Sequence, residues 1–78
     1  MKHKVLITGA NSFIGSNLTR KLVQEGFEVH CLVRENSDKW RLEGLNIKFW
    51  IGDLRERESI FEIVKKINPD IIFHLATA

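Results

Sequence analysis

The stretch Val5-Leu6-Ile7-Thr8-Gly9-Ala10-Asn11-Ser12-Phe13-Ile14-Gly15 decides the fold of this chain. Its apolar start predicts a short buried strand, and its end opens an amphipathic helix. Gly9 can turn where a side chain would clash, and Gly15 lets the helix and the strand approach closely. A strand, a glycine-bracketed turn and a helix present backbone N–H groups and a partial positive charge to a phosphate.

The rest of the chain alternates short apolar runs with helical stripes. Strands are predicted over residues 4–8, 27–33, 47–51 and 71–75, because these runs are short and bounded by polar or glycine positions. Helices are predicted from residue 13 to Gly26 and from the residues after Leu54 to Asn68, with a short helical turn over 39–42. In the strand 47–51, the alternation places Lys48 and Trp50 on the more exposed face.

This order of elements predicts an α/β fold with a doubly wound parallel sheet of about four strands in the order 3-2-1-4. Strands joined by helical crossovers are parallel, and such crossovers are right-handed in nearly every known case. The fourth strand would have an apolar free edge, which is an association hazard. We therefore expect residues 1–78 to be the N-terminal part of a dinucleotide-binding domain that lacks the rest of the domain and the substrate region.

Composition excludes several classes of protein. The chain has 78 residues and a formal net charge of +2, with basic and acidic residues interleaved, which argues against a nucleic-acid surface. No apolar run reaches the roughly 18 residues of a membrane span, and the N-terminus enters a strand at once, so we expect a cytoplasmic protein without membrane contact. The lone Cys31 is interpreted as a buried small hydrophobe, and no cysteine–histidine spacing indicates a metal site.

Three spaced motifs resemble the extended short-chain dehydrogenase/reductase family, of the NAD-dependent epimerase/dehydratase type. They are Thr8-Gly9-x-x-Ser12-Phe13-Ile14-Gly15, Gly52-Asp53-Leu54-Arg55 and His74-Leu75-Ala76, and together they cover the chain in register. The family contains nucleotide-sugar epimerases, dehydratases and reductases. Its members often form homodimers through helices later in the chain, so the resemblance leaves a homodimer open here.

The resemblance implies a role for each matching residue. The turn from Gly9 to Gly15 would hold a pyrophosphate, Asp53 with Leu54 would meet the adenine amine, and the chain end would line the ribose. His74 matches a position that is mostly structural in the family. The implied cofactor-binding residues are Gly9, Asn11, Ser12, Phe13, Ile14, Gly15, Arg34, Asp53, Leu54, Ala76, Thr77 and Ala78.

Two positions depart from the family pattern. Ser12 stands where the family has its middle glycine, so its side chain needs space, and its hydroxyl could donate to a phosphate oxygen instead. The chain contains no tyrosine, so the downstream Tyr-x-x-x-Lys pair of the family is absent and no catalytic residue is assigned. Asp53 also has a plain interpretation as a cap of the helix that follows it, and the two roles can coexist.

The end of the second strand predicts NADP over NAD as the cofactor. A carboxylate at this position favours NAD, whereas an arginine accommodates the 2′-phosphate of NADP. The family's acidic position falls on Val33, which has no acceptor, and Arg34 follows with a guanidinium suited to phosphate. Two alternatives stay open: Glu35 could turn inward and reverse the preference, and Arg34 could be a solvated loop charge.

The resulting prediction is the NAD(P)-binding portion of a short-chain enzyme that acts on a small molecule, a nucleotide-sugar by family analogy. Epimerisation, dehydration and ketone reduction are the reactions that this class offers. A non-catalytic NAD(P) sensor of the same fold is the alternative, and a degenerate relic without a ligand is a third.

Overall fold

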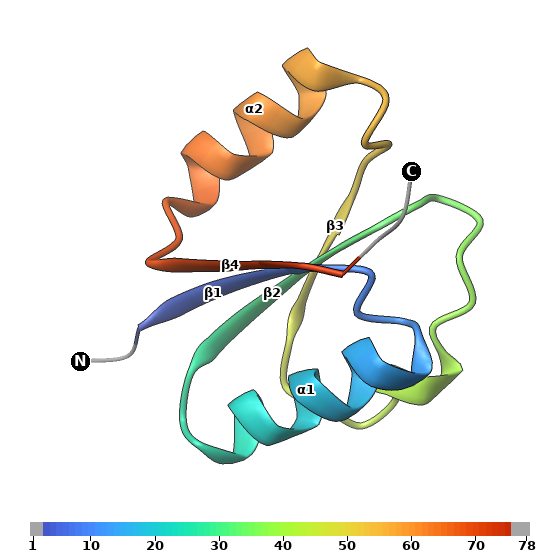
Figure 1. Cartoon of the computed structure of the whole chain (residues 1–78), viewed down its shortest axis with the longest axis vertical. Coiled ribbons are helices and arrows are strands. Elements are labelled where there is room, and N and C mark those ends of the chain that lie inside the picture. Colours follow the sequence, from blue (N-terminus) through green and yellow to red (C-terminus); the bar gives the residue numbers. More distant parts are fainter. Residues whose placement is uncertain (1–2, 76–78) are drawn as a thin grey trace.

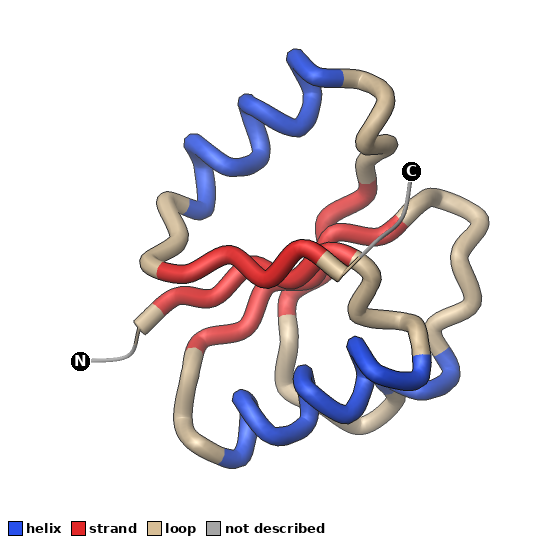
Figure 2. The backbone as a smooth tube through the Cα atoms, viewed as in Figure 1, coloured by secondary structure: helices blue, strands red, loops and turns tan. Residues whose placement is uncertain are grey.

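The computed structural model describes residues 3–75 and shows a four-stranded parallel sheet between two helical layers (Figures 1 and 2). The elements are β1 (Lys4–Thr8), α1 (Phe13–Gln24), β2 (Glu28–Val33), the single-turn 3-10 helix η1 (Trp40–Leu42), β3 (Lys48–Ile51), α2 (Arg57–Ile67) and β4 (Ile71–His74). The strand order is β3-β2-β1-β4, and all three pairings are parallel. The predicted fold class, strand order and element types are confirmed, with boundaries that shift by at most two residues.

The central strands are buried on both faces, and this divides the core into two clusters. Val5 and Ile7 of β1 point to one face, where they pack with Leu22 of α1 and Leu42 of η1. The alternate residue of β1, Leu6, points to the other face, which α2 covers in Figure 1. Its cluster partners are Leu32 and Ile67, with Trp50, Leu54, Ile60, Ile63 and Val64 packed against them.

Both helices end where the sequence predicts. The chain leaves α1 through Gly26, whose φ of 89° lies in the left-handed region that glycine adopts at little cost. Its N–H donates to the carbonyl oxygen of Val23 at 3.1 Å. The chain leaves α2 through Asn68, which is also left-handed at φ 51° and precedes a proline. Cys31 is fully buried as expected, and burial raises the pKa of its thiol to about 12.

The expected exposure of β3 is confirmed for Lys48 and wrong for Trp50. Phe49 and Ile51 of this edge strand are also exposed, at 41% and 51%, whereas Trp50 is half-buried. Trp50 packs on the face that α2 covers, and its indole N–H finds a buried acceptor on His30 at 2.9 Å. The alternation of side chains is real, but the helix that covers each face decides which residues are buried.

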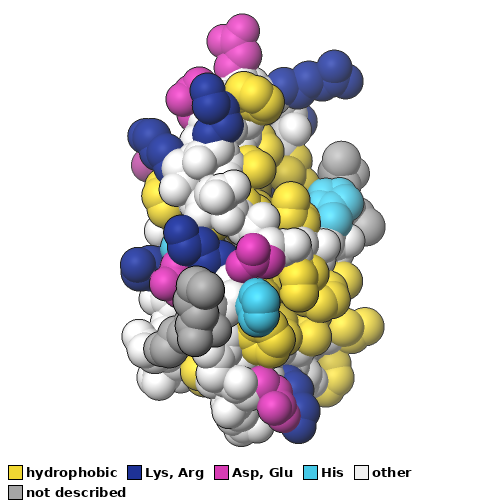
Figure 3. All heavy atoms as spheres, turned by 90° about the vertical axis from the view of Figure 1, so that its left-hand side faces the viewer, with side chains coloured by type: hydrophobic (Ala, Val, Ile, Leu, Met, Phe, Trp, Pro, Cys, Tyr) yellow, Lys and Arg dark blue, Asp and Glu magenta, His cyan; other side chains and the backbone are white. Residues whose placement is uncertain are grey.

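The outer edge of β4 is free within the described residues, because β1 is the neighbour with which it pairs. Ile71 and Ile72 on this strand are 41% and 51% exposed. Hydrophobic side chains also gather over one side of the molecule in the space-filling view (Figure 3). The apolar edge predicted from the sequence is therefore present. Neither α1 nor α2 has the length and apolarity that a membrane-spanning helix requires.

Candidate functional site

The turn between β1 and α1 brings the helix start against the backbone of the strand end. Gly9 has a φ of 78°, which favours glycine, and its carbonyl oxygen accepts from the N–H of Ser12 at 3.2 Å. A Cβ built on Gly15 would lie 2.1 Å from that carbonyl oxygen, a distance no real side chain tolerates. Gly15 is therefore required by close approach of two backbones, as the sequence predicted.

Ser12 takes the place of the family's middle glycine without strain, because its φ of −77° is ordinary for any residue. Its hydroxyl donates to the carbonyl oxygen of Gly9 at 2.9 Å and accepts from the N–H of Gly15 at 3.0 Å. Ser12 is thus the N-cap of α1. The hydroxyl hydrogen is directed into the turn, and its donation to a phosphate oxygen stays a prediction.

Two backbone donors remain at the start of α1. The N–H groups of Phe13 and Ile14 have no hydrogen-bond partner within residues 3–75, as is usual for the first turn of a helix. The side chains of Phe13 and Ile14 are 69% and 71% exposed, so the N–H groups lie beside solvent-facing residues. Neighbouring Asn11 is half-buried in the same turn. These donors suit an anion, since the helix dipole adds a partial positive charge there.

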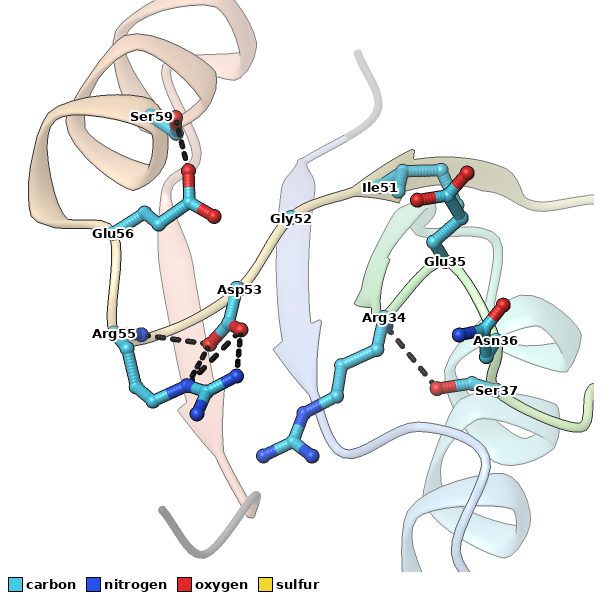
Figure 4. Close-up of a pocket in the computed structure, with 10 residues that line it drawn as sticks. All are labelled: Arg34, Glu35, Asn36, Ser37, Ile51, Gly52, Asp53, Arg55, Glu56 and Ser59. Carbon is cyan, nitrogen blue, oxygen red and sulfur yellow. Dashed lines mark hydrogen bonds and ion pairs between the residues drawn. The ribbon is translucent and has the colours of Figure 1, made fainter.

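A cavity of about 640 Å³ lies where β2 and β3 end (Figure 4). The loop after β2 forms one wall and the segment from the end of β3 to the start of α2 forms the other. In open parallel sheets, ligands bind beyond the carboxyl ends of the strands, as this cavity would allow. Its lining residues are Arg34, Glu35, Asn36, Ser37, Ile51, Gly52, Asp53, Arg55, Glu56 and Ser59.

The guanidinium of Arg34 has no hydrogen-bond or ion-pair partner among the described residues, although it lines this cavity. Its backbone is held by a short turn: the N–H of Arg34 donates to the Ser37 hydroxyl at 3.2 Å, and the N–H of Ser37 donates to the Arg34 carbonyl oxygen at 3.1 Å. Glu35 also lines the cavity, so the sequence-based alternative that it faces the site stays open.

Asp53 and Arg55 form an ion pair on the opposite wall (Figure 4). Nη2 of Arg55 lies 2.6 Å from Oδ2 of Asp53, and the backbone N–H of Arg55 donates to Oδ1 at 2.9 Å. These hydrogen bonds hold the pKa of the Asp53 carboxyl well below its usual range, and the nearby Arg34 charge lowers it further. The Asp53 side chain does not cap α2, since Glu56 occupies the N-cap position.

The side chain of Leu54 does not face the cavity that Asp53 lines. It is half-buried in the core cluster below α2, with Trp50 and Ile60, and it does not line the cavity. A contact between Leu54 and a ligand in the cavity would therefore involve its backbone. The assignment of Leu54 to adenine stays a prediction.

Two further predictions concern the end of β4. The ring Nδ1 of His74 lies 2.6 Å from the Thr8 hydroxyl, which ties β4 to β1 beside the turn that begins at Gly9 and agrees with a structural role for His74. Ala76, Thr77 and Ala78 lie outside the described residues, so their predicted contact with the ribose is untested.

Sequence reasoning assigned a role to Arg34 and Asp53 and weighed Glu35, but it gave no role to the other seven cavity residues, which are Asn36, Ser37, Ile51, Gly52, Arg55, Glu56 and Ser59. A signal existed for two of them. Ser37 lies three residues after Arg34, and Arg55 lies two residues after Asp53. At these spacings a polar side chain commonly forms a hydrogen bond with nearby backbone. Nothing in the pattern of α2 distinguished Ser59.

A parallel sheet with unpaired donors after β1 and a polar cavity after β2 and β3 defines a nucleotide-binding α/β protein. The chain belongs to the NAD dependent epimerase/dehydratase family, whose model matches residues 5–78. The resemblance stated from the motifs is thereby confirmed.

The relatives include proteins whose names indicate different substrates. Sterol demethylase protein B of Methylococcus capsulatus is 37% identical over 71 residues, which are 91% of this chain and 21% of that protein. Dihydroflavonol 4-reductase of Gerbera hybrida is 36% identical over 81 residues, which cover 94% of this chain and 22% of that protein. The chain thus spans about a fifth of the length of these relatives.

Solved structures match the whole fold. UDP-glucose 4-epimerase of Thermotoga maritima, determined with UDP-glucose, is 30% identical with a TM-score of 0.82 over 95% of this chain and 24% of that chain. UDP-glucose 4-epimerase of Thermus thermophilus, determined with NAD, is 29% identical with a TM-score of 0.83 over 96% of this chain and 24% of that chain.

Proposed function

We propose that this chain is the NAD(P)-binding portion of an extended short-chain dehydrogenase/reductase that acts on a nucleotide-sugar. The observation that carries the proposal is the pair of unpaired N–H groups of Phe13 and Ile14 on a helix that Gly15 holds against β1. Family membership and the NAD and UDP-glucose complexes of similar epimerases support it. The cofactor, when bound, supplies the hydride chemistry.

The residues of this chain fit such a cofactor. Backbone donors at the start of α1 suit a pyrophosphate, and the cavity at the ends of β2 and β3 has room and polarity for an adenosine. In this assignment Asp53 accepts a hydrogen bond from the adenine amine, and the turn from Gly9 to Gly15 binds phosphate oxygens. The chain then binds and orients the cofactor, while the reacting groups lie elsewhere in the enzyme.

For the cofactor itself, we infer NADP over NAD. Arg34 supports this preference because its guanidinium lines the cavity without an internal partner, whereas Arg55 on the other wall is neutralised by Asp53. An unpaired guanidinium is well suited to the 2′-phosphate that distinguishes NADP. Val33 supplies no carboxylate for a ribose hydroxyl.

Calorimetric titration with NADP(H) and NAD(H) tests both the binding of a dinucleotide and the preference for NADP. NADP should bind tighter than NAD, and Arg34→Met should weaken NADP by about ten- to hundredfold, since charged hydrogen bonds are lost, while NAD changes little. Arg57→Met is the matched control, because Arg57 is an exposed arginine on α2 outside the cavity. Tighter binding of NAD refutes the NADP assignment, and absence of binding of either refutes the proposed function.

We also infer that residues 1–78 form the N-terminal part of a larger dinucleotide-binding domain in a cytoplasmic protein. The apolar free edge of β4 and the short span relative to the relatives support this extent. A non-catalytic sensor of the same fold is the alternative function. The downstream sequence discriminates the two, because a Tyr-x-x-x-Lys pair indicates the enzyme.

A further inference from the structure

The carboxylate of Asp53 is held on both oxygens by a single residue, Arg55. Nε of Arg55 lies 3.1 Å from Oδ1 and 3.1 Å from Oδ2, Nη2 lies 2.6 Å from Oδ2, and the backbone N–H lies 2.9 Å from Oδ1. Side chain and backbone of Arg55 therefore fix both the position and the plane of the carboxylate. Figure 4 shows this fork beside the open cavity.

This arrangement leaves few acceptor positions on Asp53. An ionised carboxylate offers about four lone-pair positions on its two oxygens. Three N–H groups of Arg55 donate to it: Nε is shared between the two oxygens, Nη2 donates to Oδ2, and the backbone N–H donates to Oδ1. Three donors on about four lone pairs leave one acceptor position of the carboxylate, which matches a ligand that brings a single N–H donor to this wall.

The backbone under this pair is also fixed. The N–H of Gly52 donates to the Val33 carbonyl oxygen at 3.0 Å, so the pairing of β2 and β3 continues up to the residue before Asp53. The Asp53 side chain is 22% exposed and that of Arg55 is 77% exposed. The carboxylate is thus the more enclosed partner of the ion pair.

We propose that Arg55 is a positioning residue for base recognition, which holds the Asp53 carboxylate so that one oxygen accepts from the exocyclic amine of adenine. The inference deepens the proposed function and rests on it for the place of the base. Arg55 acts through Asp53 and makes no contact of its own with the base. Charge supports the same role, since Arg55 keeps the carboxyl ionised and therefore an acceptor.

The test measures how the natural full-length chain binds adenosine monophosphate and inosine monophosphate. The base of the first has an exocyclic amine, and the base of the second has a carbonyl in its place. Arg55→Met should weaken adenosine monophosphate about twofold to fivefold, the range expected from an exposed ion pair, and should reduce its advantage over inosine monophosphate. Arg55→Lys, which keeps the charge but loses the fork, should recover part of the loss. Arg57→Met is the control and should change neither affinity.

A double-mutant cycle separates positioning from direct contact. In an Asp53→Asn background, Arg55→Met should cause no further loss of adenosine monophosphate affinity. A loss that persists in that background, or tighter binding by Arg55→Met alone, overturns the inference. Circular dichroism of each variant excludes misfolding. The mononucleotide probe also distinguishes the two proposals. A wild type that binds adenosine monophosphate but neither NADP nor NAD contradicts the proposed function alone. A wild type that binds none of the three nucleotides contradicts both the proposed function and the role of Arg55.

Discussion

The indole N–H of Trp50 on β3 donates to Nδ1 of His30 on β2 at 2.9 Å. His30 is only 4% exposed, and its other ring nitrogen, Nε2, lies 2.8 Å from a carboxylate oxygen of Glu28. Because an indole can only donate, Nδ1 of His30 must accept and Nε2 must carry the hydrogen that is donated to Glu28. A buried polar side chain is thereby fully satisfied on the face of the sheet below α2.

Replacement of Trp50 by phenylalanine should destabilise the protein by about 1–3 kcal/mol, because a buried acceptor on His30 loses its donor. The midpoint of urea unfolding, followed by circular dichroism, measures the change. Trp40→Phe is the matched control, since Trp40 is 58% exposed and its loss should change stability by less than about 0.5 kcal/mol. Equal effects of the two substitutions would contradict a structural role for the Trp50–His30 hydrogen bond.

The same network predicts part of the acid sensitivity. The hydrogen bond from His30 lowers the pKa of Glu28 below its ordinary value of 4.5. A carboxyl with a lowered pKa stabilises the folded state fully above its unfolded pKa, and this contribution disappears as pH falls through the folded pKa. Glu28→Gln should therefore lose stability at pH 7 and show a shallower decline below about pH 4.5.

Urea unfolding at pH 7 and at pH 3.5 measures this difference. Glu62→Gln provides the control, because Glu62 is an exposed glutamate on α2 with no hydrogen bond or ion pair among residues 3–75. A steep acid decline that survives in Glu28→Gln would show that other carboxyls, such as Asp53, account for it.

The fold could be predicted from local sequence patterns because each strand and helix has its own apolar periodicity, bounded by glycine or polar residues. The turn from Gly9 to Gly15 and the apolar run of β1 fixed the central strand, and crossover handedness fixed the order of the others. The burial of Trp50 could not be predicted, because it depends on which face of the edge strand α2 covers.

The candidate site was predictable only in part, for a similar reason. Backbone geometry at Gly15 follows from residue type, since no other side chain fits there. The pairing of Arg55 with Asp53 and the free state of Arg34 are choices of flexible side chains, and no spacing rule determines them. Leu54 was assigned to the ligand, and its side chain packs in the core below α2, a position that depends on where that helix lies.

Substitution of Gly15 by alanine should damage both stability and nucleotide binding. The added Cβ would meet the Gly9 carbonyl oxygen at 2.1 Å, so α1 must move away from β1, at a cost of about 1–3 kcal/mol or more. Displacement of α1 also moves the N–H groups of Phe13 and Ile14, and dinucleotide affinity should fall about tenfold or more as these bonds weaken.

Gly44→Ala is the matched control for this experiment. Gly44 has a φ of 79°, so alanine is strained there, but nothing lies within 4 Å of the added Cβ. A loss of about 1 kcal/mol in stability with unchanged nucleotide affinity is expected from Gly44→Ala. If Gly15→Ala folds correctly and binds the dinucleotide as tightly as the wild type, the start of α1 is not the phosphate site.

The free edge of β4 predicts self-association of the 78-residue chain when it is prepared alone. Ile72 is 51% exposed on a strand whose outer edge has no partner strand among residues 3–75, and lysine at such an edge is a common natural protection against pairing. Ile72→Lys should shift the sedimentation of concentrated samples toward the monomer.

Phe61→Lys is the control, because it removes a comparable side chain, 62% exposed, from the surface of α2. It should leave association unchanged, because a helix face offers no strand edge. A wild-type chain that sediments as a stable monomer and unfolds in one two-state transition would show that the edge needs no cover, and the inference that residues 1–78 belong to a larger domain would lose its structural support.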